Sequence, residues 1–197
     1  MVLSLANSLS HSRTNARKRY RVIALGGTFD HLHKGHRALL DEGFRRGDRV
    51  LIGVVSDELA KALGKMPDGN FNERRKAVEE YIRKKHPKAK WETFPLYEPY
   101  GPFGSDPKVE AIVVTPESLP RAESGNAARI KKGLRPVDIL MVPLVLADDG
   151  VRISSTRVRK REIDIEGHLI RSAGGGSPKK QLLNPKKMAI VRKGETS

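Results

Sequence analysis

Hydrophobic and polar positions along the chain follow two patterns: short apolar runs, and longer segments with apolar residues three or four positions apart. The first pattern is typical of buried strands and the second of helices that cover them. The apolar runs predict strands over 21–25, 49–55, 90–97, 109–114 and 138–142. The helical pattern predicts helices over 35–46, 58–63, 72–85, 126–132 and 156–161.

Strands that alternate with helices predict an α/β fold, a doubly wound parallel sheet of five strands, Rossmann-like, in a single domain. In such sheets, ligands bind beyond the carboxyl ends of the strands, near the point where the strand order reverses. Side chains that follow strand ends are therefore the first candidates for function.

The net charge of +15 is concentrated at the two ends of the chain. Residues 1–21 carry five Lys or Arg and no acid, and residues 171–197 carry seven Lys or Arg and one acid. We therefore divide the chain into a flexible basic arm (1–20), a folded domain (21–170) and a basic tail that contains Gly, Ser and Pro (171–197). A nucleic-acid-binding domain usually shows a basic face in its folded part. We accordingly expect only non-specific contacts of the ends with nucleic acid.

Composition also limits the location and the class of protein. The apolar runs are too short to cross a membrane, and the absence of cysteine excludes disulfides and thiol catalysis. The acid-free start matches either a disordered arm or a mitochondrial transit peptide. We expect a cytoplasmic protein, with a monomer as the favoured state.

The first candidate site follows the first predicted strand. Gly26-Gly27-Thr28-Phe29 leads into His33-Lys34-Gly35-His36, at the start of the first predicted helix. The glycines let a phosphate approach the backbone, and the free N–H groups of a helix start favour an anion. Two histidines three positions apart can face one ligand there. A plain turn, or a zinc site that includes Asp30 and His31, is the alternative, although the nearby ligands do not complete a zinc site.

The second candidate site is Ile153-Ser154-Ser155-Thr156, which Arg157 and Arg159 follow. Ser154 or Ser155 is a good N-cap for the short helix, and its hydroxyl-rich first turn beside arginines suits phosphate oxygens. An ordinary capped basic helix is the alternative.

These residues resemble the signatures of a known superfamily. His33-Lys34-Gly35-His36 resembles the His-x-Gly-His signature of the nucleotidyltransferases, and 153–159 resembles their Ile-Ser-Ser-Thr-x-x-Arg signature. Segments between them are similar to the archaeal and eukaryotic type of phosphopantetheine adenylyltransferase. They are 54–58, 98–102, 113–117 and 133–136. Arg161 departs from this pattern, which has a glycine there.

The resemblance implies transfer of an adenylyl group from ATP, with Mg²⁺, to 4′-phosphopantetheine, with loss of pyrophosphate, a step of coenzyme A biosynthesis. It implies that Thr28 binds the acceptor phosphate or the α-phosphate. His33 and His36 would contact the triphosphate, with His36 stabilising charge at the α-phosphate. The β- and γ-phosphates would be held by Ser154, Ser155, Thr156 and Arg159, beside the glycine turn of Gly26, Gly27, Phe29 and Gly35.

The resemblance also implies roles for residues farther along the chain. Lys61 would bridge the two substrates, with Lys65 as the alternative. Arg74 would contact the acceptor and Arg129 the nucleotide phosphate. Tyr100 lies in 97–104, a segment of turn-forming residues that we expect to form a wall of the acceptor pocket. We expect no metal site made by the protein itself, because Mg²⁺ bound to phosphates keeps mostly water ligands.

Two other functions stay open. A related transferase would act on FMN, nicotinamide mononucleotide or, with CTP, glycerol 3-phosphate. A non-catalytic module that binds nucleotide or RNA would have the same fold without turnover.

Overall fold

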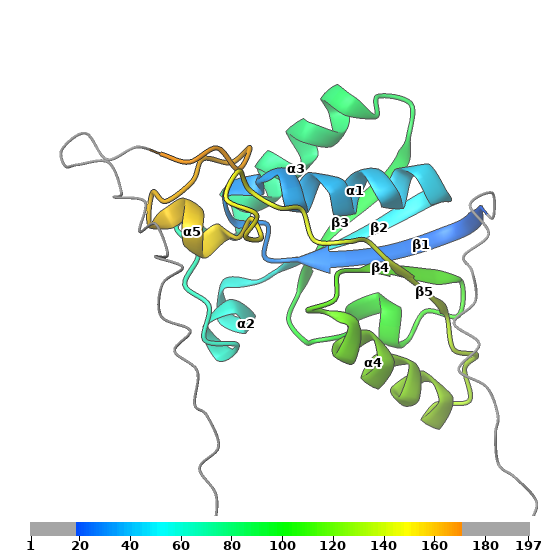
Figure 1. Ribbon diagram of the computed structural model, residues 1–197. Helices are drawn as coiled ribbons and strands as arrows, with labels where there is room; N and C mark the ends of the chain where they lie inside the picture. Colours follow the sequence, from blue (N-terminus) through cyan, green and yellow to red (C-terminus); the bar gives the residue numbers. More distant parts are fainter. Residues whose placement is uncertain (1–18, 171–197) are drawn as a thin grey trace, which may run out of the picture.

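The computed structural model describes residues 19–170. Most of the predicted arm and the whole predicted tail lie outside the described residues. Five parallel strands form one sheet in the order β3-β2-β1-β4-β5 (Figure 1). The strands are β1 (Tyr20–Gly27), β2 (Gly47–Val55), β3 (Lys90–Leu96), β4 (Ala111–Val114) and β5 (Asp138–Met141). The predicted fold class is confirmed, and the strand order reverses between β1 and β4.

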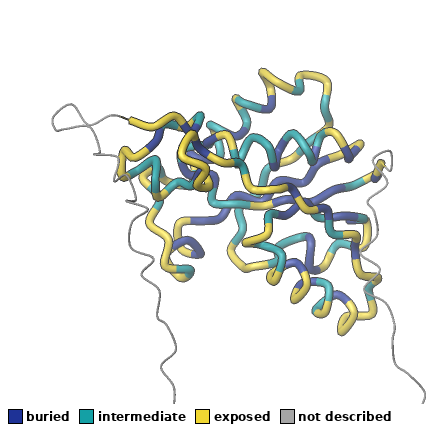
Figure 2. Tube along the Cα trace, in the orientation of Figure 1, coloured by how far each residue is buried: buried dark blue, intermediate teal, exposed yellow. Residues whose placement is uncertain are grey.

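Helices cover both faces of the sheet (Figure 1). They are α1 (Lys34–Arg46), α2 (Asp57–Ala62), α3 (Phe71–Lys85), α4 (Leu119–Lys131) and α5 (Ser155–Arg159), with 3₁₀ turns η1 (Asp30–Leu32) and η2 (Gly101–Gly104). On one face, α1 and α3 pack Leu40, Val78 and Ile82 against the strands. Figure 2 shows the strands mostly buried between exposed outer turns.

The other face of the sheet is covered by α4 and by the loop between β3 and β4. Phe103 of this loop packs against Ala24 and Leu51 of the sheet. A Cβ on Gly125 of α4 would lie only 2.1 Å from the Phe103 ring, so this helix needs a glycine at the contact.

Four helices begin one residue earlier than predicted, and α4 begins seven residues earlier. The predicted start of α4 at Asn126 is wrong, because the helix begins at Leu119, with Pro120 in its first turn. Ser124 and Gly125 are poor helix formers, so the sequence pattern did not predict the first half of this helix. The N-cap of α2 is Ser56, whose side chain accepts from Leu59 N. The carboxylate of Asp57 accepts from Phe71 N at the start of α3.

After β5 the chain stays at the carboxyl edge of the sheet and forms a small separate cluster around Ala147, Ile153 and Ile163. This cluster carries α5. It is joined to the start of α1 by a hydrogen bond from Lys34 N to Ile165 O at 2.8 Å and by the Arg37–Glu166 ion pair. The second signature motif therefore lies beside the first.

Candidate active site

Both signature motifs line one pocket of about 810 Å³ at the carboxyl edge of the sheet, here named the motif pocket. It lies where the strand order reverses, as expected for this class of fold. The predicted site residues that line it are Gly26, Gly27, Thr28, His33, Gly35, His36, Tyr100, Ser154, Ser155, Thr156 and Arg159. The structure thus brings together residues up to 133 positions apart in the sequence, Gly26 and Arg159.

The turn after β1 has an unusual backbone. Phe29 and His31 have φ values of 55° and 57°, in the left-handed region that disfavours side chains. Phe29 does not line the motif pocket as predicted for a ligand contact; it is buried, and its ring packs edge-on against His36 at 5.4 Å. The strained turn therefore places Phe29 behind His36 as a support.

His33 and His36 stack in parallel, with ring centroids 3.8 Å apart and an angle of 18° between the planes. Burial, reinforced by the nearby charge of Arg37, lowers the pKa of His33 to about 4. Burial and the neighbouring His33 hold the pKa of His36 well below its ordinary value. Both imidazoles are therefore neutral at pH 7 in the protein without ligand, and each keeps one N–H to donate.

The Nδ1 atoms of both histidines are buried and lack a hydrogen-bond partner among residues 19–170. Buried polar atoms without a protein partner are rare, and they are explained by strain, a catalytic role, or a bound water or ion. A phosphate oxygen in the motif pocket is a suitable partner for an imidazole N–H. Its negative charge would also raise the pKa of both rings.

Helix α5 presents the hydroxyl groups of the second motif. The side chain of Ser154 caps the helix by accepting from Arg157 N at 3.4 Å. Ser155 Oγ donates to Asp30 O at 2.9 Å, and Arg159 Nη2 donates to Thr156 Oγ1 at 3.3 Å. The second motif is therefore tied to the turn of the first.

Lys65, and not Lys61, is the lysine of the motif pocket. Lys65 Nζ donates to Thr28 Oγ1 at 3.3 Å. Partial burial and, to a smaller extent, the nearby charge of Arg121 lower the pKa of Lys65. Lys61 is exposed on α2 and does not line the pocket. A helical lysine and a loop lysine four positions apart look alike in sequence, so only the path of 64–70 after α2 separates them.

Arg74 and Arg129 were predicted to contact the substrates, but neither of them lines the motif pocket. Arg74 is 3% exposed and donates to Thr28 O, Gly69 O, Val55 O and Asp57 Oδ1. Arg129 is 1% exposed and donates to Phe103 O at 2.6 Å, Asp106 O at 2.9 Å and Arg135 O at 2.8 Å. The N–H groups of both arginines therefore bond to acceptors of the protein itself and stabilise the fold.

Several charged residues that line the pocket were missed from the sequence. Arg121 of α4 makes no hydrogen bond or ion pair within residues 19–170. Arg152 forms an ion pair with Glu117, and Asp30 forms one with Arg159. Glu117 follows the end of β4, so the strand-end rule was the signal that could have found it.

No three His, Asp or Glu side chains within 19–170 gather to hold a metal ion. Both acids that line the motif pocket are paired with arginines, so they are not free as ligands.

The described part of the chain also contains no helix that is long and apolar enough to cross a membrane.

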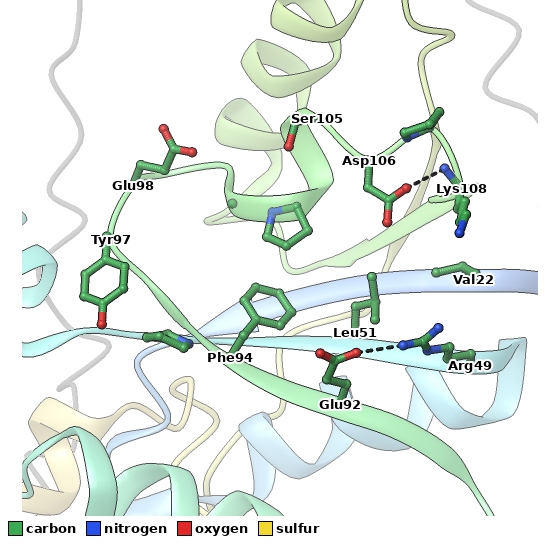
Figure 3. Close-up of a pocket in the computed structure, with 14 residues that line it drawn as sticks. Val22, Arg49, Leu51, Glu92, Phe94, Tyr97, Glu98, Ser105, Asp106 and Lys108 are labelled. Atoms are coloured by element: carbon green, nitrogen blue, oxygen red, sulfur yellow. Dashed lines mark hydrogen bonds and ion pairs between the residues drawn. The ribbon is translucent and has the colours of Figure 1, made fainter.

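A second cavity of about 1020 Å³, here named the loop groove, lies between the sheet and the segment 97–108 (Figure 3). Val22 and Leu51 form its floor, Phe94 points into it, and the exposed Arg49–Glu92 ion pair lies at its edge. Neither signature motif contributes to its lining. The predicted acceptor segment divides between the cavities: Tyr100 lines the motif pocket and Tyr97 the loop groove.

Comparisons with known proteins agree with the resemblance of the motifs. The cytidylyltransferase-like family model matches residues 24–161. A phosphopantetheine adenylyltransferase of Methanothermobacter thermautotrophicus is 47% identical over 159 residues, 81% of this chain and 95% of the relative. One from Methanopyrus kandleri is 42% identical over 141 residues, 72% of this chain and 90% of the relative.

Among solved structures, a protein of unknown function from Archaeoglobus fulgidus superposes with a TM-score of 0.56 and 34% identity. The match covers 61% of this chain and 87% of that one. A lipopolysaccharide core biosynthesis protein from Thermoplasma volcanium shares the fold, with a TM-score of 0.51 and 20% identity over 62% of this chain and 95% of that one.

Proposed function

Because the chain belongs to the phosphopantetheine adenylyltransferase family, within the cytidylyltransferase-like family, we propose that it makes dephospho-coenzyme A from ATP and 4′-phosphopantetheine. An oxygen of the acceptor phosphate attacks the α-phosphorus of ATP. The bond from the α-phosphorus to the bridging oxygen breaks, and pyrophosphate leaves with the electron pair.

One observation carries the proposal: two neutral, stacked histidines line the same pocket as the hydroxyl-bearing start of α5. The acceptor phosphate is already an anion near pH 7, so the reaction needs no general base. It needs donors that hold two polyanions in line and spread the charge of the transition state. The lining of the motif pocket supplies such donors.

The roles of the individual residues follow from their positions. Lys65 and Thr28, which share a hydrogen bond, would bind the phosphate between the two substrates. His36 would donate to the α-phosphate, with His33 stacked against it and donating to the triphosphate. Ser154, Ser155, Thr156 and Arg159 would hold the β- and γ-phosphates.

The inner part of the motif pocket suits the pantetheine arm. Its lining includes the large apolar side chains of Phe94, Leu96 and Tyr100, and Leu96 packs over Gly26 and Gly53 of the strands. A Cβ on Gly53 would lie 2.7 Å from Leu96, so the close packing of this side chain on the strand needs a glycine. An apolar cleft with a cationic end matches an acceptor that has a phosphate at one end and a long arm.

ATP enters this proposal as its Mg²⁺ complex, in which the metal shields phosphate charge and is held by phosphate oxygens and water. The arginine pairing of Asp30 and Glu117 agrees with a metal that arrives with the substrate. The monomeric state and the cytoplasmic location stay predictions.

The test is pyrophosphate release from Mg·ATP with 4′-phosphopantetheine, beside parallel reactions with FMN, nicotinamide mononucleotide and glycerol 3-phosphate (the last also with CTP). We expect turnover with phosphopantetheine alone. Turnover with another acceptor would keep the chemistry and replace the substrate. Folded protein that binds ATP but turns over none of them would contradict the proposal and favour a binding module.

A further inference from the structure

Asp30 is an acid in a pocket that we propose for polyanions. It is only 2% exposed, and its carboxylate lies at the wall that carries both signature motifs. A buried carboxylate is costly unless it is paired, and its charge repels phosphate. Neither property helps to bind ATP directly, so the carboxylate calls for another role.

Both carboxylate oxygens of Asp30 are used, and they join two different segments. Oδ2 accepts from Arg159 Nη1 of α5 at 2.6 Å. Oδ1 accepts from the backbone N of Asp68 at 3.2 Å, in the loop that carries Lys65. The Asp68 side chain in turn contacts His31 Nε2 at 2.8 Å. Asp30 is thus the point where the two phosphate-binding segments meet the turn after β1.

The bond to Asp30 sets the direction of the Arg159 guanidinium. The side chain of Arg159 is 27% exposed and lines the motif pocket. Nη1 donates to Asp30 and Nη2 to Thr156, which leaves three of the five N–H donors without an acceptor within residues 19–170. A planar fork fixed along one edge presents its remaining donors in a defined direction, which suits phosphate oxygens.

We propose that Asp30 is a positioning residue of the adenylyl transfer, which fixes Arg159 toward the β- and γ-phosphates of ATP and keeps the Lys65 loop beside it. This inference rests on the proposed function. It assigns Asp30 no contact with substrate, because its oxygens are occupied by protein donors.

The Asp30→Asn variant separates positioning from charge, because the two effects have opposite signs. If the carboxylate acts only through its charge, removing it makes the pocket more positive and ATP binds more tightly. If it positions Arg159, ATP binds about 10-fold more weakly and kcat/KM falls by about 10–100-fold. The measurements are the Kd of Mg·ATP by calorimetry and the rate of pyrophosphate release. AMP, which lacks the β- and γ-phosphates, should bind within about twofold of the native affinity.

The chain offers a matched control. Asp149 is an exposed carboxylate that pairs with Arg157 of the same helix α5, away from the lining of the motif pocket. Asp149→Asn removes the same charge from a similar pair, and we expect ATP binding and turnover to stay within about twofold. Equal losses in both variants would show a general effect of charge or of helix stability, and would overturn the proposal.

A second variant covers the case in which Asp30→Asn fails to fold, as judged from circular dichroism. Arg159→Lys keeps the positive charge but loses the fork, and should reproduce the weaker binding of ATP with unchanged binding of AMP. In the Arg159→Gln background, Asp30→Asn should weaken ATP binding by less than about a further twofold, because the two residues act as one unit. Tighter ATP binding in Asp30→Asn, native affinity in Arg159→Lys, or additive losses would each overturn the role. If no acceptor is turned over but the ATP affinities follow this pattern, the proposed function fails, and the part of the inference in which Asp30 orients Arg159 toward bound ATP stands.

Discussion

The motif pocket and the loop groove lie on the same sheet and differ in what their walls contain. The groove is larger, about 1020 Å³ against about 810 Å³, yet its Arg49–Glu92 pair has side chains 53% and 55% exposed. Such an ion pair is largely solvated and contributes little to the stability of the fold. In the motif pocket, the corresponding Asp30–Arg159 pair is 3% and 27% exposed, and two imidazole nitrogens are buried without partners. The volume of a cavity therefore does not identify the active site. Buried side chains that the fold holds in place, some of them without hydrogen-bond partners, identify it.

The largest test of this difference is His36→Ala against Arg49→Ala. Loss of one donor at the transition state should lower kcat/KM for ATP by about 10²–10³-fold while ATP still binds. Arg49→Ala, in the loop groove, should stay within about twofold. Steady-state kinetics of pyrophosphate release measure both. A native rate in His36→Ala would remove the role assigned to this histidine.

The second test uses stability and the pKa of His33. In the unfolded chain this pKa is near 6.5, and in the folded protein burial lowers it to about 4. Between these values the unfolded state binds a proton that the folded state does not, so the free energy of unfolding decreases as the pH falls from 6.5 to 4. His33→Asn should remove up to about 3 kcal/mol of this decrease.

Urea unfolding at pH 7.5 and at pH 4.5 measures the effect, with both proteins compared at each pH. His168→Asn, which replaces an exposed imidazole, is the control and should keep the decrease of the native protein. If the free energy of unfolding decreased equally on acidification in the native protein and in His33→Asn, His33 would not be held neutral by the fold.

These tests concern residues that local sequence could reveal. The five strands and the two signature motifs follow from apolar runs, glycines and spacing, which are local properties. Arg129 shows the limit: the sequence places an arginine on a helix, but only the packing of α4 turns it toward the carbonyls of Phe103 and Asp106. Gly125 shows the same limit, because the contact that requires it comes from a distant loop. Asp30 and Arg159 pair across 129 positions, which no local pattern predicts.

The third test separates two lysines. Lys65→Ala should lower kcat/KM by about 10–100-fold, the size expected for one hydrogen bond to a charged group. Lys61→Ala, four positions away on the exposed side of α2, should stay within about twofold. The reverse order would restore Lys61 as the bridging residue and would require 64–70 to move on binding.

The smallest test compares two tyrosines of one segment. Tyr100 is half-buried and lines the motif pocket, whereas Tyr97 is 71% exposed and lines the loop groove. Tyr100→Ala removes apolar surface that we assign to the acceptor arm, so KM for 4′-phosphopantetheine should rise about 5–10-fold with little change in kcat. Tyr97→Ala should leave both within about twofold. If Tyr97→Ala raised this KM and Tyr100→Ala did not, the acceptor arm would lie in the loop groove, and the larger cavity would become part of the active site.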